Sequence, residues 1–270
     1  MEWERLVDRA VALAEAGDPD AAVDQATDAV MLALGLGPGP LARCLVTLGY
    51  ARILAGELAD GRDSLREAIA VAAPDDHPTL ADAWHHLGSA LQHDGDLKAA
   101  EVALRQSLQH RETAWGADHP YLAKGWGDLA RIAFQRGARG AGVSSLLLRG
   151  QGILERAIAA PAPGHDVAEL RYDASTIATN LLLVRMEDGR WDEALRSARA
   201  AVEHLDAFVA LGREVPDAAR ERLIGYLAAL EAEGERGARE LTERVRRLVP
   251  LELEIETVDD LDLTGFERDE

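Results

Sequence analysis

The sequence predicts an all-α fold, a solenoid of helical hairpins, on three observations. A helix-sized block with an apolar pair, a Gly about seven residues later and small residues at two fixed offsets recurs five times. Hydrophobic residues make up 47% of the chain but aromatic residues only 4%, which favours Ala- and Leu-rich helix packing over a β-rich fold. The 270 residues are enough to bury a large core.

Each copy of the block is expected to form one hairpin of two helices. The third copy is the most complete, with Leu87-Gly88 in its first helix, Gly95 near the turn and Ala100 in its second helix. Small residues at fixed offsets allow two helices to approach to an interaxial distance of roughly 8–10 Å. The expected elements are repeats at about 3–34, 42–73, 81–112, 123–160 and 175–206, closing helices at about 216–248 and a tail at 250–270.

Two Asp-His-Pro sequences, 76–78 and 118–120, lead into the third and fourth repeats. Proline suits the first helical position, and it favours an extended conformation for the histidine before it. The aspartate would then lie near the positive end of the helix dipole. We therefore interpret both sequences as helix starts and expect structural roles for His77 and His119.

The motif Leu87-Gly88, Gly95 and Ala100 resembles a tetratricopeptide (TPR) repeat, a unit of two antiparallel helices. TPR units are about 34 residues long. The longer intervals here, together with the Asp-His-Pro sequences, look like the subtype found in kinesin light chains and many bacterial regulators. The resemblance implies a right-handed superhelix of at least five repeats with a C-terminal closing helix pair and a short acidic tail.

TPR proteins generally line a concave groove with the first helix of each repeat, so the resemblance implies a partner-binding face. Its expected residues are Arg43, Tyr50, His85, Ser89, Gln92, Lys124, Arg131, Phe134 and Asn180. TPRs that clamp the C-terminal carboxylate of heat-shock chaperones use Lys and Asn at set positions, where this chain has residues such as Val46, Tyr50 and His86. We therefore do not expect a peptide of that kind. Lys124 and Arg131 are expected to attract an acidic ligand.

The Gly/Pro-rich run Gly35–Pro40 lies where a connection between repeats is due. No strand-like run precedes it, and its two prolines lack the N–H donors that a phosphate-binding loop needs. We interpret the run as a linker.

The segment from Gly137 to Ala160 departs from the repeat, because the interval from Ala130 to Leu182 is roughly ten residues longer than the preceding one. Either the turn after Gly137 is enlarged, or one long helix begins near Ser144 and tolerates Gly150 and Gly152. We expect the enlarged turn, since glycine inside a helix costs about 1 kcal/mol relative to alanine.

The apolar triplet Leu146, Leu147 and Leu148 lies in the same segment. It either packs on the neighbouring repeat or forms a protruding contact for another protein.

The tail from Pro250 to Glu270 carries nine acidic residues against Arg268 alone. Leu251, Leu253 and Ile255 alternate with glutamates, a period typical of a strand, but a lone strand cannot satisfy its own backbone. The tail is therefore either disordered, or it pairs with a partner's sheet edge or folds back on the repeats. Leu253, Ile255 and Phe266 are possible partner contacts.

A formal charge of −19, from 48 acidic and 29 basic residues, disfavours nucleic acid as a partner. The acidic start of the chain lacks the pattern of a signal peptide, and no run of about 20 apolar residues is present, so we expect a cytoplasmic protein without a membrane span. The single cysteine, Cys44, is expected to fill the core.

No catalytic motif stands out. His85 and His93 are about 12 Å apart along a helix, too far to share a metal, and there is no metalloprotease, P-loop or nucleophile-elbow pattern. We expect no enzyme activity, metal or cofactor.

The sequence favours a protein-interaction adaptor or scaffold, with composition that hints at a high-GC bacterium. The alternative is a ligand-responsive regulator or a secretion-type chaperone. Regulators of this kind often carry an N-terminal DNA-binding segment, and here the repeats start almost at Met1, which favours the adaptor.

Overall fold

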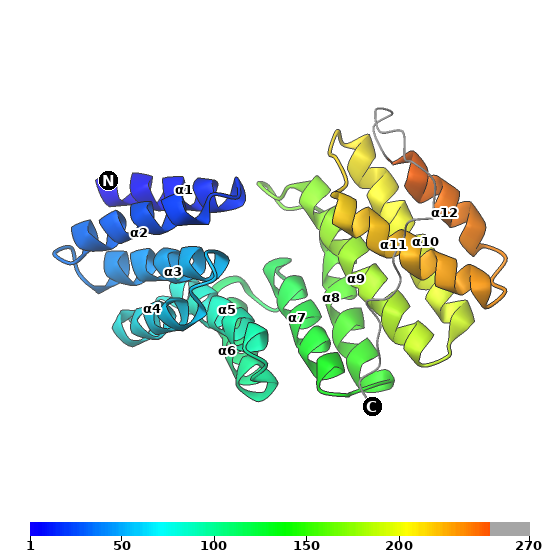
Figure 1. The fold of residues 1–270 in the computed structure, drawn as a ribbon, viewed down its shortest axis with the longest axis horizontal. Coiled ribbons are helices and arrows are strands. Elements are labelled where there is room, and N and C mark those ends of the chain that lie inside the picture. The colour runs from blue at the N-terminus through cyan, green and yellow to red at the C-terminus, as the bar shows by residue number, and fades with distance from the viewer. Residues whose placement is uncertain (249–270) are drawn as a thin grey trace.

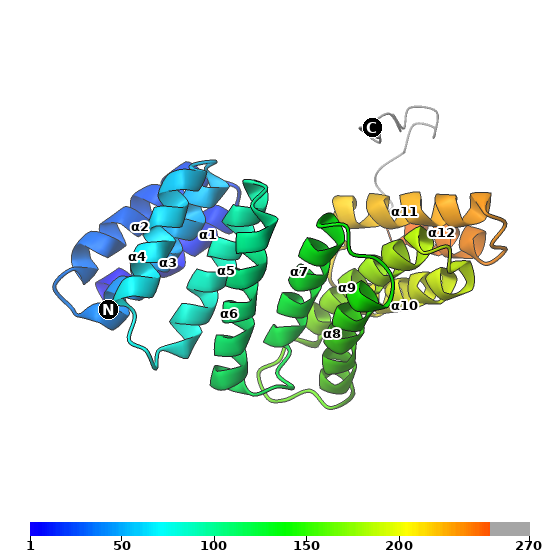
Figure 2. The same ribbon diagram turned by 90° about the horizontal axis from the view of Figure 1, so that it is seen from below.

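The computed structural model describes residues 1–248, and within that range it contains twelve helices and no strand. They are α1 (Glu2–Glu15), α2 (Pro19–Ala33), α3 (Pro38–Leu54), α4 (Leu58–Val71), α5 (His77–His93), α6 (Leu97–Trp115), α7 (Tyr121–Gln135), α8 (Ala141–Ala159), α9 (Val167–Glu187), α10 (Trp191–Ala210), α11 (Asp217–Ala232) and α12 (Ala238–Arg247). The helices succeed one another along the long axis of the molecule (Figures 1 and 2). The predicted all-α solenoid is confirmed, whereas the acidic tail with Leu253, Ile255 and Phe266 lies outside the described residues.

A left-handed glycine ends the first helix of every hairpin. These glycines are Gly17, Gly56, Gly95, Gly137, Gly189 and Gly234, with φ between 67° and 90°. The residue after each glycine donates its N–H to the carbonyl group five residues earlier, as from Asp96 to Leu91. This is the Schellman arrangement, which satisfies carbonyl groups left over at the helix end. The glycines predicted at the turns therefore set the shape of each hairpin.

Small residues lie where the two helices of a hairpin come closest. A Cβ atom added to Gly49 in α3 would lie 2.6 Å from Cγ of Leu65 in α4, and one added to Gly88 in α5 would lie 2.9 Å from Cγ of Leu104 in α6. Both leucines are buried. Any larger side chain at these glycines would push the helices apart.

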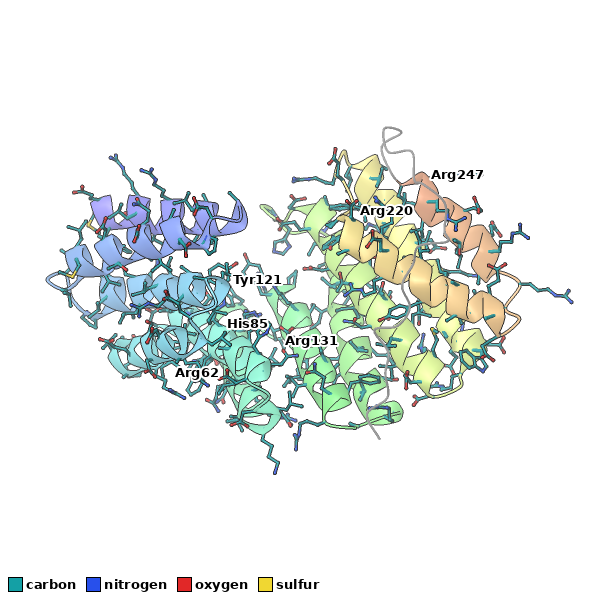
Figure 3. The ribbon with its side chains drawn as sticks, viewed as in Figure 1. Arg62, His85, Tyr121, Arg131, Arg220 and Arg247 are labelled. Atoms are coloured by element: carbon teal, nitrogen blue, oxygen red, sulfur yellow. The ribbon has the colours of Figure 1, made fainter. Side chains whose placement is uncertain are left out.

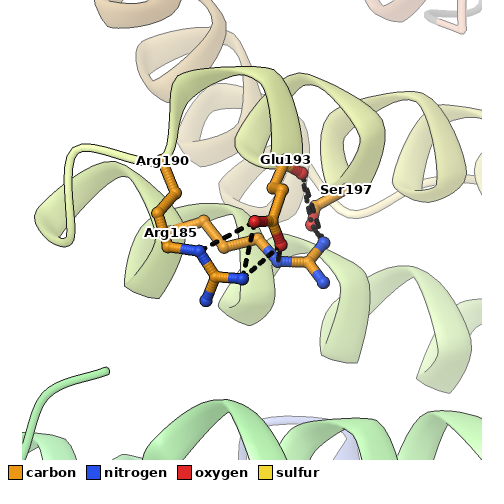
Figure 4. A network of polar contacts seen from close by, with 4 residues as sticks. All are labelled: Arg185, Arg190, Glu193 and Ser197. Carbon is orange, nitrogen blue, oxygen red and sulfur yellow. Dashed lines mark hydrogen bonds and ion pairs between the residues drawn. The ribbon is translucent and has the colours of Figure 1, made fainter. Parts of the chain in front are cut away.

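In each of two hairpins, an arginine of the first helix makes the same contact with a serine of the second helix. Nη1 of Arg52 donates to Oγ of Ser64 at 2.8 Å, and Nη1 of Arg185 donates to Oγ of Ser197 at 2.5 Å. Each serine in turn donates to the carbonyl oxygen four residues before it. In the later hairpin Glu193 adds an ion pair to Nε of Arg185 at 3.6 Å (Figure 4). The repeated contact shows that these hairpins share one internal geometry.

The hydrophobic core runs along the solenoid between consecutive helices. One cluster of buried residues extends from Leu45 in α3 to Val184 in α9, and a second extends from Ala178 in α9 to Val245 in α12. Because α9 contributes to both clusters, it connects the two parts of the core. A smaller cluster around Trp3 and Cys44 closes the N-terminal end.

The enlarged turn expected after Gly137 is wrong, because α8 is one continuous helix from Ala141 to Ala159. Gly150 lies inside it for a packing reason. A Cβ atom there would lie 2.9 Å from Cδ1 of Ile177 in α9 and 3.0 Å from the carbonyl oxygen of Ala123 in α7. Gly150 therefore allows α7, α8 and α9 to pack closely.

Three helix starts also differ from the prediction. Residues 34–37 connect α2 to α3, since Pro38 begins the helix after Gly37, which has φ 102°. The fifth hairpin begins at Val167, eight residues before the expected start at 175. Asp76 caps α5, with Oδ1 accepting from the Thr79 N–H at 3.3 Å, and His77 is already helical rather than extended.

The aspartate of the second Asp-His-Pro sequence does not cap its helix, and Nδ1 of His119 accepts from the N–H of Tyr121 at 3.3 Å instead. Pro120 is the N-cap of α7 and makes no side-chain cap hydrogen bond, while Asp118 pairs with Arg156 of α8 at 2.6 Å. The aspartate of this sequence therefore caps a helix in the third repeat and pairs with an arginine in the fourth.

The leucine triplet of α8 divides between core and surface. Leu147 is 1% exposed and Leu146 packs against the main core, whereas Leu148 is 47% exposed. The structure supports packing on the neighbouring helices, and a protruding contact that includes Leu147 is wrong. Cys44 is buried in α3, and burial raises the pKa of its thiol to about 11, as expected for a core residue.

Replacement of Gly49 by Ala should lower the free energy of unfolding by about 1–3 kcal/mol, because the new Cβ overlaps Leu65. A matched control is Gly225→Ala in α11, where the glycine is exposed and no atom lies within 4 Å of the added Cβ. There alanine should be neutral or should stabilise by up to about 1 kcal/mol. Urea unfolding followed by circular dichroism measures both, and equal stabilities for the two variants would contradict the packing described.

Candidate partner-binding groove

Three cavities open on the face formed mainly by the odd-numbered helices, which are the first helices of the hairpins. We call them the N-terminal cavity, between α1 and α5, the aromatic cavity, between α5 and α10, and the arginine cavity, between α7 and α11. Their volumes are about 420, 510 and 200 Å³. His85, Tyr121 and Arg131 lie in the central part of the molecule (Figure 3).

The aromatic cavity combines four rings with five charged side chains. It is lined by Asp82, Arg111, Trp115, Pro120, Tyr121, Lys124, Glu169, Tyr172, Asp173 and Phe208. The rings are held in pairs, with Trp115 edge-on to Tyr121 and Tyr172 tilted against Phe208, each pair having a centroid distance of 5.3 Å. The cavity thus has fixed aromatic walls contributed by α6, α7, α9 and α10.

Arg111 is the most buried charged side chain of this cavity, at 7% exposed. Its Nη1 donates to the carbonyl oxygen of Tyr121 at 2.9 Å, and its Nη2 lies 3.9 Å from Oδ1 of Asp82. Burial lowers the pKa of Arg111, while Asp82 counteracts this, and the guanidinium stays protonated. Arg111 therefore holds the start of α7 and has its charge partly matched inside the protein.

Two of the three carboxylates of the aromatic cavity, those of Asp82 and Asp173, are partly desolvated. Burial raises the pKa of both Asp82 and Asp173, although Arg111 opposes the shift at Asp82 and Lys124 opposes it at Asp173. Asp82 keeps 54% of its side chain accessible, but it points into a concave surface where protein replaces much of the surrounding water. Both carboxylates would gain from an additional cation.

The arginine cavity has a different composition. Its lining is Ala130, Arg131, Phe134, Val143, Leu147, Asn180, Leu183, Val184, Arg222 and Tyr226, and none of these is acidic. Arg131 lies at the rim, where its Nη2 donates to Oδ1 of Asp128 at 3.0 Å. The guanidinium carbon of Arg139 lies 4.1 Å from the centroid of the Phe134 ring. The side chains of Arg131, Arg222 and Asn180 thus surround an apolar floor.

The N-terminal cavity is lined by Val7, Arg43, Val46, Thr47, Asp76, Pro78, Thr79 and Asp82. Asp82 also lines the aromatic cavity, so the two are adjacent. The guanidinium of Arg43 lies 5.3 Å from the ring of Trp3. The three cavities therefore succeed one another along the same face.

His85 and His86 lie in α5 and line none of the three cavities. Tyr50 lies against His86 with a centroid distance of 4.7 Å. Burial lowers the pKa of both histidines to about 3, helped at His85 by the cations Arg111, Lys124 and Arg131 and at His86 by His85, Arg111 and Lys124. Nδ1 of His85 lies 3.6 Å from Oδ2 of Asp128, and neither atom has a hydrogen-bond partner. Both rings are neutral at ordinary pH.

Five of the nine groove residues named from the sequence line one of the three cavities. Arg43 lines the N-terminal cavity, Lys124 the aromatic cavity, and Arg131, Phe134 and Asn180 the arginine cavity. Tyr50 and His85 line none of the three cavities. Ser89 lines none of the three, and Gln92 is engaged with Gln135 of α7 at 2.7 Å.

Sequence reasoning missed most of the aromatic cavity. Arg111, Trp115 and Phe208 lie on the second helices α6 and α10, which we expected to face away from the groove. Tyr172 and Asp173 were missed because the fifth hairpin begins earlier than predicted. The spacing of the apolar residues before position 175 could have indicated the earlier helix start. Leu170 and Ala174 are two of these residues, and both are buried in α9.

Within residues 1–248 no group of three or more His, Cys, Asp or Glu side chains is arranged to hold a metal ion. Across the same part of the chain, none of the helices has the length and apolar character needed to cross a membrane.

No family model matches this sequence, and no curated protein is similar enough to match it. Solved structures do show its fold. The apo form of RapI aligns with a TM-score of 0.59 and 12% identity, over 92% of this chain and 63% of that one. BtubC (BKLC) from P. vanneervenii aligns with a TM-score of 0.55 and 17% identity, over 92% and 91%.

The TPR-like repeats of a kinesin light chain from Podosopora anserina align with a TM-score of 0.54 and 15% identity, over 74% of this chain and 93% of that one. The chain therefore has the fold of TPR-like repeat proteins, kinesin light chain-like repeats among them, and the resemblance noted in the sequence is confirmed. At these identities the similarity establishes the fold alone.

Because His85 and His86 are neutral in the folded protein and have ordinary pKa values near 6.5 when unfolded, acid should destabilise the fold. Their contribution is complete above pH 6.5 and declines as the pH falls toward 3, by up to about 1.4 kcal/mol per pH unit for each ring. Urea unfolding at pH 7 and pH 5 should show a smaller difference for the variant His85→Gln with His86→Gln than for the parent. Imidazole NMR signals of the two rings that titrate near pH 6.5 would contradict this.

Proposed function

We propose that this protein is a non-catalytic adaptor or scaffold of the cytoplasm that binds a segment of another protein in the groove formed by the three cavities. The observation that carries the proposal is the aromatic cavity. Four rings and several partly desolvated charges converge there from five helices, α5, α6, α7, α9 and α10. Tyrosine, tryptophan and arginine are the side chains that dominate the energetics of protein interfaces.

The extent of the groove favours a protein segment over a compact small molecule. The cavities are adjacent through Asp82 at one junction and share α7 and α9 at the other. A ligand that contacts all of them must extend across helices from α1 to α11. An extended chain does this with one residue after another, whereas a small ligand would occupy one cavity.

The solved structures of similar fold support the proposal through their shape alone. A ligand-responsive regulator or a secretion-type chaperone would use the same groove, and these remain the alternative hypotheses. They differ from the adaptor in what binding does to the protein, not in where the ligand lies.

Site-specific photo-crosslinking tests the proposal. A benzoylphenylalanine in place of Tyr121, which is 59% exposed in the aromatic cavity, should become covalently joined to the partner in lysate of the native host. The matched control is the same amino acid in place of Val102, which is 60% exposed on α6 and lines none of the three cavities. Equal crosslinking from the two positions, or crosslinking from Val102 alone, would reject the groove as the binding surface.

A further inference from the structure

The aromatic and arginine cavities lie at opposite ends of the same two helices and differ in charge. α7 contributes Tyr121 and Lys124 to the first and Arg131 and Phe134 to the second. α9 does the same, with Tyr172 and Asp173 near its start and Asn180 and Leu183 further along. The pair of helices therefore forms one track with a recognition pocket at each end.

The carboxylates make the aromatic cavity suited to a cationic side chain. Three carboxylates face two cations there, and Arg111 is already engaged by Tyr121 and Asp82. Lys124 is exposed at the rim and has a flexible stem that can turn toward water. The aromatic faces attract a cation further through their quadrupoles. A lysine or arginine of the partner would balance the excess of carboxylates over cations in this cavity.

The arginine cavity suits a carboxylate. Arg131 and Arg222 are exposed at its rim, Asn180 supplies an amide, and the lining has no acidic member. Burial raises the pKa of Tyr226, with Glu187 adding to the shift and Arg222 opposing it, so the phenol keeps its proton and can donate a hydrogen bond. Asp128 holds Arg131 by one nitrogen, which leaves other N–H donors of this guanidinium free for a ligand.

The spacing of the two cavities fixes the spacing of the two ligand charges. Lys124 and Arg131 are seven residues apart on α7, which is about 10 Å at 1.5 Å per residue. Asp173 and Asn180 are separated by the same interval on α9. A peptide extended in the polyproline II conformation covers this distance in about three residues, at roughly 3.1 Å each, and its three residues per turn place side chains i and i+3 on the same side.

We propose that the partner segment is an extended peptide with a basic side chain and an acidic side chain about three residues apart. The basic side chain enters the aromatic cavity and the acidic one enters the arginine cavity. This inference rests on the proposed function and names the partner class for the same groove. It also gives the bound segment a direction, because the two pockets bind opposite charges.

Selection from a phage library of random dodecapeptides on the immobilised full chain tests the pairing. Enriched peptides should carry Lys or Arg and Asp or Glu at a separation of two to four residues, with one order of the two charges predominating. Synthetic peptides from the selection should lose at least about tenfold in affinity for the variant Arg131→Glu with Arg222→Glu, because each reversal sets like charges against each other. A fresh selection on that variant should replace the acidic residue by a basic one.

A second groove variant addresses the other pocket. Glu169→Gln with Asp173→Asn should lose the preference for Lys or Arg and keep the preference for the acidic residue. The control for the reversal of Arg131 and Arg222 is Arg66→Glu with Arg105→Glu, which makes the same charge change as that reversal at exposed positions of α4 and α6 outside the three cavities. Its affinity for the selected peptides should stay within about twofold of the parent, and circular dichroism should confirm that every variant is folded.

The outcomes separate this inference from the proposed function. If selected peptides bind the parent and both groove variants equally, the groove is not the binding surface and both proposals fail. If binding requires the groove but the peptides lack the charge pair, or insert it with the opposite polarity, the inference alone is overturned. A library that yields no enriched peptide also overturns it.

Discussion

The close approach of paired helices at glycine is the constraint on which the rest of this structure depends. Gly49 and Gly88 leave room for Leu65 and Leu104, and Gly150 allows α8 to pack against both α7 and α9. Each hairpin in such a solenoid is supported by its neighbours only. The distance between helices inside a hairpin therefore also sets where the next hairpin lies, and with it the position of every side chain in the groove.

The positions of the charged side chains in the groove follow from this packing. The start of α7 is held by Arg111, which reaches across from α6 to the carbonyl oxygen of Tyr121. That contact brings a cation, two carboxylates and aromatic rings into one poorly solvated space. The cost of desolvating these groups is visible in the raised pKa values of Asp82 and Asp173. Groups kept in such a state are candidates for recognition of a complementary charge.

Much of the fold could be predicted from the sequence, because a turn glycine and a small residue at a helix crossing are local signals. Gly95 and Gly137 end their helices as expected. The segment around Gly150 could not be predicted in this way. A glycine that ends a helix and one that admits a neighbouring helix look alike in sequence. Only the contacts of Gly150 with Ala123, on the other helix of its hairpin, and with Ile177, in the next hairpin, distinguish them.

The groove was predictable only in part. Residues on the first helices, such as Lys124 and Arg131, were found because the repeat period fixes their face. Arg111 and Phe208 were not, since their approach to the cavity depends on how α6 and α10 end and not on the repeat.

The structure of this chain bound to its partner segment is the most direct measurement of the central claim, that the groove on the odd-numbered helices is the binding surface. The account predicts an extended backbone between α7 and α9, with its side chains in the aromatic and arginine cavities. A partner bound on the faces of α4, α6 and α8, with both cavities empty, would contradict it.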